Sequence, residues 1–321
     1  MNSRLHKAID LLDEGLRLYR NGFLGFIQIT SLWAVPVIIS TGIFMASLNV
    51  LTPTMAFFPA LGWFLLLTLL SFYLVGALSH ATRTMQQGQR INVRRSLTIS
   101  PLRISGMGCY GTLYLLVATV ISWGILFFVA YITIFLVLIL GSGWAMTSET
   151  LGGTFGTVAS LLILVVILAI ILTVYMFSIV FSIAVSGSAY SSLVYALQPF
   201  VQEKLSFLES INRSITMIFY RFTHNLLVFL LASLIFISTA LSVATTIGVL
   251  LPLPLLWAFG SESLITQGSG IVSWFLGLIV ILPPMPIWMT LLYQYNLTAY
   301  QGSELIEHIA AASSPHSSPS V

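Results

Sequence analysis

Charge is scarce in this sequence. Only 7% of its 321 residues are charged, whereas 58% are hydrophobic and the mean hydropathy is +1.01. Soluble domains carry about 25% charged and about 45–50% apolar residues. A chain with so little polar surface cannot cover a water-soluble globule of 35.2 kDa. We therefore predict an integral membrane protein, with apolar runs that leave no room for a separate soluble domain.

Cysteine is nearly absent as well. The single cysteine, Cys109, excludes an intrachain disulfide and a cysteine zinc cluster. Because it stands in an apolar segment, we expect a small buried packing residue, with a reactive thiol as the alternative. None of the five histidines has a second histidine three or four residues away. The sequence thus predicts no metal, cofactor-binding or catalytic residues, and no enzyme.

Long apolar runs are abundant. A bilayer core requires about 20 apolar residues, and six segments meet that requirement, near 23–48, 57–80, 104–138, 158–190, 224–250 and 271–295. The third and fourth are longer than a straight span and should tilt, kink or project past the bilayer. Pro36 is expected to interrupt the first segment, and Pro283, Pro284 and Pro286 the sixth. The fold class predicted is an all-α membrane protein with six transmembrane helices arranged as three hairpins.

The spans have no acidic or basic residue near their middle. Ion-coupled transporters usually place ionisable groups there, so this absence argues against a coupled pump. Passive movement of a lipid or a neutral solute stays open.

Cations are absent from one side of the chain. The connections near 49–56, 139–157 and 251–270 contain none, while all 12 lysines and arginines precede the first span or lie in the other two connections. The positive-inside rule then places both termini in the cytoplasm. A cleavable secretory signal is not predicted at the N-terminus either, so we expect a multi-pass protein of the plasma (inner) membrane.

Five of these cations cluster in RTMQQGQRINVRRSLTISPLR, residues 83–103. A nucleic-acid patch would bring aromatic residues or a known module, and this stretch has no aromatic residue, so no nucleic acid is expected. The cluster is best read as topogenic. Contact with anionic headgroups is compatible with that reading. The candidate headgroup contacts are Arg83, Arg90, Arg94, Arg95, Arg103, Arg213 and Arg221.

Each pair of spans follows an amphipathic stretch that ends in an arginine: Arg20, Arg103 or Arg221. In the first stretch one face carries Leu5, Ile9, Leu12, Leu16 and Tyr19; in the third it carries Val201, Leu205, Leu208, Ile211, Ile215 and Ile218. This pattern is typical of helices that lie in the membrane interface. We predict an interfacial helix over 1–22, a six-span domain over 23–295 and a cytosolic tail over 296–321 with a disordered end.

Three stretches resemble the membrane domain of some glycerophosphoryl diester phosphodiesterases and related six-span bacterial proteins. They are LLDEGLRLYRNGFLGF at the start, residues 196–221 with Glu203 and the pair Arg213–Ser214, and the closing LLYQYNLTAYQGSEL. That family's closing stretch usually carries an aspartate and arginines, where this chain has Tyr295, Leu297 and Ala299. The catalytic barrel that follows the membrane domain in the phosphodiesterases is absent from these 321 residues.

Two features suggest packing or a solute path. Ser178, Ser182 and Ser186 recur every four residues in the fourth span, which favours close packing of helices over a polar path. The prolines of the sixth span, at 283, 284 and 286, could expose backbone carbonyls to a cavity, or only bend the helix.

These features together predict a non-catalytic membrane protein that organises, assembles or regulates a membrane complex or the lipid around it. The alternative is a transporter or a lipid-translocating protein. The expected partners are membrane lipids and other membrane proteins.

Overall fold

The computed structural model describes residues 2–48, 55–150, 154–203, 205–250, 252–260 and 263–313. The chain is about 91% helical, and the described residues contain no strand. Within this described part of the chain, six segments are long and apolar enough to cross a membrane: Phe23–Phe44, Phe57–Gln86, Pro101–Phe135, Leu164–Gln202, Phe222–Phe259 and Gly268–Ser303. The predicted all-α class and its six candidate spans are confirmed.

The elements follow one another with short connections. In order they are α1 (Asn2–Asn21), α2 (Phe23–Leu48), α3 (Phe57–Gln86), α4 (Val93–Leu97), α5 (Pro101–Thr150), α6 (Thr154–Ala196), α7 (Gln198–Gln202), α8 (Phe207–Phe219), α9 (Phe222–Thr245), the π-helical turn η1 (Thr246–Leu250), α10 (Leu253–Phe259), α11 (Leu264–Ile281) and α12 (Pro284–Ser313).

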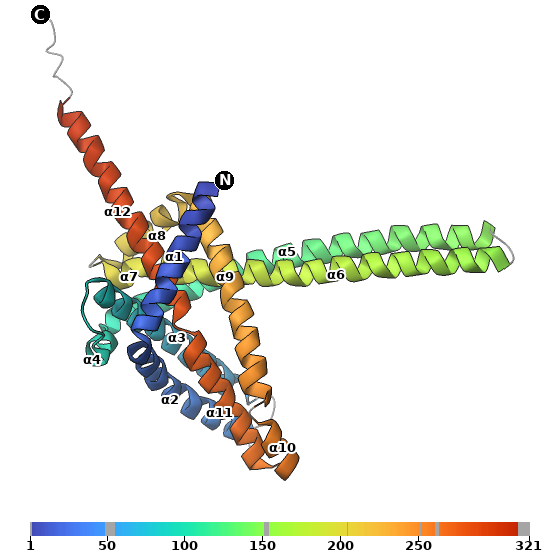
Figure 1. The fold of residues 1–321 in the computed structure, drawn as a ribbon, viewed down its shortest axis with the longest axis horizontal. Helices are drawn as coiled ribbons and strands as arrows, with labels where there is room; N and C mark the ends of the chain where they lie inside the picture. The colour runs from blue at the N-terminus through green and yellow to red at the C-terminus, as the bar shows by residue number, and fades with distance from the viewer. Residues whose placement is uncertain are drawn as a thin grey trace, which may run out of the picture.

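Helices α5 and α6 form an antiparallel pair that projects away from the other helices (Figure 1). At 1.5 Å per residue, the 50 residues of α5 extend about 75 Å. The predicted connection near 139–157 is wrong over most of its length, because α5 continues to Thr150 and α6 begins at Thr154. Glycines in this stretch cost only ~1 kcal/mol each in a helix. We call the described residues of 113–181 in this pair the arm, since the large apolar side chains that the structure describes there are mostly exposed.

The remaining helices form a body around the first half of α12 (Figure 1). Trp288, Tyr293, Met285 and Leu292 of α12 are fully buried or nearly so, in contact with residues of α1, α3, α6 and α9. The core therefore lies where the last helix meets the first. Because α12 continues without a break past residue 295, the predicted boundary between membrane domain and tail does not end a helix. The predicted disordered end covers 313–321; Ser313 is the last residue of α12, and residues 314–321 lie outside the described residues.

The prolines act differently in the two spans. Helix α2 runs continuously through Pro36, so the predicted interruption of the first span is wrong. One proline removes a single backbone hydrogen bond, and the flanking turns keep theirs. In the sixth span, consecutive prolines at 283 and 284 remove two donors, and the span does divide there into α11 and α12.

Helix α1 packs on the body through a face that lies next to the predicted apolar stripe. Ala8, Leu11, Leu12 and Gly15 are buried against the body, whereas Leu5, Ile9 and Leu16 are exposed. Of the predicted stripe, Leu12 lies on the buried face and Tyr19 is half-buried. The exposed apolar residues thus form a second, neighbouring face.

Helix α8 repeats this arrangement with small polar residues. It buries Ser210, Ser214 and Met217, while Leu208 and Ile215 remain exposed. The Ser214 hydroxyl lies 2.9 Å from the Tyr110 hydroxyl of α5. In both helices small side chains allow close packing on the protein and leave an apolar face uncovered.

Candidate functional site

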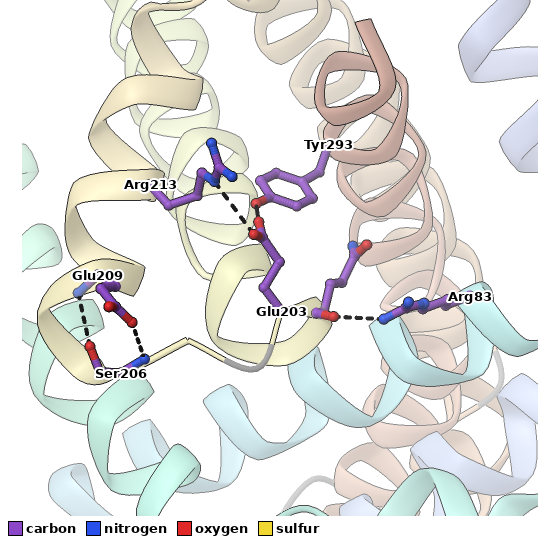
Figure 2. Close-up of polar contacts among 7 residues, drawn as sticks. Arg83, Glu203, Ser206, Glu209, Arg213 and Tyr293 are labelled. Atoms are coloured by element: carbon purple, nitrogen blue, oxygen red, sulfur yellow. Dashed lines mark hydrogen bonds and ion pairs between the residues drawn. The ribbon is translucent and has the colours of Figure 1, made fainter. Parts of the chain in front are cut away.

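The polar side chains of the body gather around Glu203, at the C-terminal end of α7. Helix α7 is separate from α6 because Pro199 stands in its first turn, and its C-cap residue Glu203 has an extended backbone. Ser206 then starts α8 as an N-cap, and its side chain forms a reciprocal capping box with Glu209. These breaks bring Glu203 back towards α8 and α12 (Figure 2).

Glu203 joins two helices. One carboxylate oxygen accepts a hydrogen bond from the Tyr293 hydroxyl of α12, and the other lies 3.4 Å from Nε of Arg213 in α8. The Arg213 guanidinium also lies over the ring of Tyr300, 5.3 Å from its centroid. Only 16% of the Glu203 side chain and 25% of the Arg213 side chain are exposed. Because the pair is partly buried, solvent screens its attraction less than that of a fully exposed ion pair.

Arg83 approaches the same turn from the end of α3. Its guanidinium donates to the backbone carbonyl of Gln202, with Nη1 2.6 Å from the oxygen (Figure 2). Two of the predicted headgroup residues, Arg83 and Arg213, are therefore engaged with α7. Arg90, Arg94 and Arg95 are exposed around α4.

The other two predicted headgroup residues lie at helix starts. Arg103 is half-buried in the first turn of α5, and Arg221 is exposed between α8 and α9. Arg221 has a left-handed backbone with φ 54°, and its guanidinium lies 5.4 Å from the ring centroid of Tyr220 and 5.9 Å from that of Tyr295.

Buried amides extend the polar cluster into the body. Gln198 donates to the Ser79 hydroxyl at 3.1 Å, and its carbonyl oxygen accepts from Gln202 at 2.8 Å and from Thr290 at 3.1 Å. Gln198 thus connects α3, α7 and α12. A buried amide costs free energy unless it is hydrogen-bonded, and here both ends of the amide are used.

A second amide pair lies beside Tyr195. Asn296 donates to the Tyr195 hydroxyl at 2.9 Å and to Oδ1 of Asn225 at 2.7 Å. The Asn225 amide in turn donates to the carbonyls of Met217, Ile218 and Tyr220 at 3.1, 3.2 and 2.7 Å, which caps the C-terminus of α8. Oδ1 of Asn296 has no hydrogen-bond partner in the described part of the chain.

Two neighbouring cavities open along α12 next to this cluster. One, of about 470 Å³, is lined by Arg83, Gln202, Glu203 and Gln301 among others. The other, of about 530 Å³, is lined by residues of α1 and α9, including Lys7, Asp10, Glu14 and His224. Gln86, Gln294 and Thr298 line both.

The other predicted site residues lie outside this cluster. Ser178 and Ser182 are half-buried in α6, Ser186 is exposed, and the Ser178 hydroxyl donates to Val174 of its own helix at 2.7 Å. Pro283 lies in the α11–α12 break, close to the end of α1, and Pro284 and Pro286 lie in the first turn of α12. Cys109 is exposed on α5, so its predicted burial is wrong. It faces outward because the buried face of α5 there carries Met107, Gly108, Tyr110 and Gly111.

The sequence reasoning missed the amides and tyrosines that hold the cluster together. An available signal was the presence of Gln198, Asn225 and Asn296 within apolar stretches, since an amide in a span usually has a partner on another helix. No group of three or more potential metal-ligating side chains occurs among the described residues.

No family model, curated protein or solved structure matches this chain. The three stretches that resemble the phosphodiesterase membrane domain do, however, meet in space. Leu12 of the first accepts a hydrogen bond from Trp288 beside the third, and Glu203 of the second binds Tyr293 of the third. The three stretches therefore lie next to one another in the body.

Proposed function

We propose that this chain is a non-catalytic membrane protein that organises or assembles a complex in the plasma (inner) membrane. The observation that carries the proposal is the division between body and arm. In the body, the charged groups of Glu203 and Arg213 pair with each other, whereas the arm presents a long apolar surface that is mostly exposed among the described residues. Such an arm is suited to packing against the spans of other proteins.

We further propose that the six spans form three helical hairpins, α2–α3, α5–α6 and α9–α11. Each hairpin would follow an amphipathic stretch that lies in the membrane interface. The exposed apolar faces of α1 and α8, next to their buried faces, support that placement. The arginines around α4 support a cytoplasmic position for that connection and for both termini.

Site-specific photocrosslinking in native membranes tests the assembly role. A photoreactive amino acid would replace Phe127, Tyr131 or Tyr175, whose side chains are 68%, 70% and 61% exposed on the arm. Matched controls would replace Leu24 or Phe58, each 75% exposed on the body. We expect discrete protein adducts from the arm positions only. Equal adducts from both sets, or lipid adducts alone, would contradict the proposal.

Cysteine labelling tests the topology. In a Cys109→Ala background, a cysteine in place of the exposed Gln89 should react with an impermeant reagent only after the cells are opened. A cysteine in place of Trp257, which is 86% exposed in α10, should react in intact cells. The reverse labelling pattern would show that the protein has the opposite orientation in the membrane.

A further inference from the structure

A large apolar cavity lies between α2, α3, η1 and α11, within the candidate spans. Its volume is about 800 Å³, which falls in the upper part of the range for small-molecule and cofactor sites. Trp33, Trp63 and Trp274 line it, one from each of three helices. The cavity is remote from the Glu203 cluster, and neither cavity beside α12 shares a lining residue with it.

The polar groups along its wall are nearly all used by the protein. The Thr41 and Ser71 hydroxyls donate to Val37 and Leu67 of their own helices at 2.7 and 2.8 Å, and Trp33 Nε1 donates to the Leu70 carbonyl at 2.9 Å. The surface offered to an occupant is therefore almost entirely hydrocarbon.

Two indoles are the exceptions, Trp274, whose side chain is 53% exposed, and Trp63. The second of them is enclosed. Its Nε1 atom is buried and has no hydrogen-bond partner within the described ranges. The ring is held in place by stacking on Phe44, with centroids 4.6 Å apart and an interplanar angle of 9°. An indole N–H is a donor only, and leaving it unpaired in an apolar environment costs free energy. Because Trp63 lines the cavity, a small rotation of its ring would turn Nε1 towards an occupant, and one acceptor atom beside a hydrocarbon chain would then remove that cost.

Glycines shape the cavity. A Cβ added at Gly42 or Gly270 would meet no atom within 4 Å, which means that the space beside both glycines is open. The third glycine of the lining, Gly248, lies in the π-helical turn, and a Cβ there would come within 3.1 Å of the Trp274 ring. Single π-helical turns in helices frequently occur at functional sites.

We infer that this cavity binds an acyl chain of a diacyl lipid, with the ester carbonyl accepting a hydrogen bond from Trp63 Nε1. A diacyl lipid combines the two required properties, a long hydrocarbon chain and an acceptor near one end. Such a lipid is also the main component of the bilayer that the candidate spans would cross. The inference concerns the α2–α3–α11 side of the body and does not rest on the proposed role of the arm.

The test uses the full-length protein in phosphatidylcholine vesicles that contain a trace of phosphatidylcholine with a photoactivatable group in one acyl chain. After irradiation, labelled peptides are mapped by mass spectrometry. We expect labelling concentrated on the peptides that contain Thr41, Leu67 and Trp274. Labelling spread evenly over these peptides and the exposed arm would indicate surrounding lipid only and would overturn the inference.

Two glycine variants test whether a side chain that fills the cavity reduces labelling more than the same substitution outside the cavity. Gly42→Leu should place its side chain in the open space and reduce labelling of the cavity peptides about ten-fold. Gly62→Leu is the matched control, because Gly62 also has nothing within 4 Å of its added Cβ but does not line the cavity. If Gly42→Leu fails to fold, Gly270→Leu provides the same block from α11. Unchanged labelling in a folded blocking variant would overturn the inference.

The proposed hydrogen bond from Trp63 Nε1 to the ester carbonyl is tested separately. A diester probe should label the wild-type cavity about three-fold more than a diether probe, which lacks the carbonyl. That ratio corresponds to a hydrogen bond of about 0.6 kcal/mol in a membrane. Trp63→Phe keeps an aromatic ring and removes the donor, so the two probes should then label equally. A diester preference that persists in Trp63→Phe would overturn the assignment of the donor.

Discussion

The phenol hydroxyl of Tyr19, near the end of α1, donates a hydrogen bond of 2.8 Å to the backbone carbonyl of Val280 in α11. In a continuous α-helix that carbonyl would accept from the residue four positions later. That residue is Pro284, which has no N–H. A side chain from the other end of the sequence therefore supplies the donor that the proline lacks, and it links α1 to the break in the last span.

Tyr19→Phe should lower the stability of the protein by about 0.6–1.7 kcal/mol, the range for hydrogen bonds between membrane helices. The ring remains, so the loss reports on the hydroxyl alone. Thermal unfolding in detergent would measure it. Tyr131→Phe, at an exposed position of the arm, is the control and should have no effect. In a Pro284→Ala background, where the backbone N–H can return, the cost of Tyr19→Phe should shrink; an unchanged cost would show that the hydroxyl does not compensate for the proline.

The Tyr19 hydroxyl should also stop stabilising the protein at strongly alkaline pH. Burial raises the pKa of the Tyr19 phenol from 10.0 to about 12. A pKa that is higher in the folded state gives stability that is fully present below the unfolded value and is lost as the pH rises through the folded value. The stability difference between the protein and Tyr19→Phe should therefore be constant up to about pH 10.

Gly15 allows α1 to lie against α12. A Cβ at this position would lie 2.3 Å from Cδ1 of Trp288, which is only 1% exposed and whose Nε1 donates to the Leu12 carbonyl at 2.9 Å. Gly15→Ala should destabilise the protein by ~1–3 kcal/mol through overpacking, although alanine is the better helix former by ~1 kcal/mol. In Gly62→Ala, with open space around the new Cβ, only the helix preference acts, so this control should unfold at an equal or higher temperature.

Glu203 should be coupled energetically to Tyr293. Removing the charge in Glu203→Gln weakens both the pair with Arg213 and the hydrogen bond from the phenol, and we expect a loss of about 1.5–3 kcal/mol. Tyr293→Phe should cost less in the Glu203→Gln background than in the wild type, with a coupling energy of at least 0.5 kcal/mol for residues in contact. Asp13→Asn, at an exposed carboxylate of α1, is the control for charge loss. Strict additivity of the two substitutions would mean that the contact contributes nothing.

The first turn of α8 should become less stable at acidic pH. The backbone N–H of Ser206 donates to the Glu209 carboxylate at 2.9 Å, and this bond, followed by that to the serine side chain, lowers the pKa of Glu209 from its ordinary 4.5. A lowered pKa gives stability that is present above the unfolded value and is lost as the pH falls through the folded one. Amides in the first turn of α8 should therefore lose protection, measured relative to their intrinsic exchange rates at the same pH, below pH 4.5. Glu209→Gln has no charge to lose, so the same pH slope in that variant would refute the assignment.

The sequence predicted the helical class and the number of spans because both follow from the length of apolar runs and the bilayer thickness. The faces of α1 and α8 were harder to predict. A hydrophobic stripe identifies an apolar face, but the buried face of α1 is built around Ala8 and Gly15, and that of α8 around Ser210 and Ser214. Small residues are buried because they let backbones approach, and hydrophobicity alone does not reveal this.

The Glu203 cluster was predictable only in part. Its members come from α3, α7, α8 and α12, and nothing in the spacing of Glu203 and Tyr293 along the chain indicates that they touch. Among the prolines, composition gave the break at 283–284 but not the continuity of α2 through Pro36. The difference arises because neighbouring turns can compensate for one missing donor more readily than for two in succession.

The close approach of α6 to α9 runs through Gly187, one position beyond the serine row. A Cβ at Gly187 would lie 2.7 Å from both Cβ of Ser233 and Cδ1 of Ile237. Gly187→Ala should thus destabilise the protein by ~1–3 kcal/mol. Simultaneous replacement of Ser178, Ser182 and Ser186 by alanine keeps the small volumes, and the Ser178 hydroxyl bonds only within its own helix, so this variant should unfold within a few degrees of the wild type. If the alanine variant keeps its unfolding temperature but abolishes a measured flux of lipid or solute across vesicles, the serines line a path and the packing interpretation of the row fails.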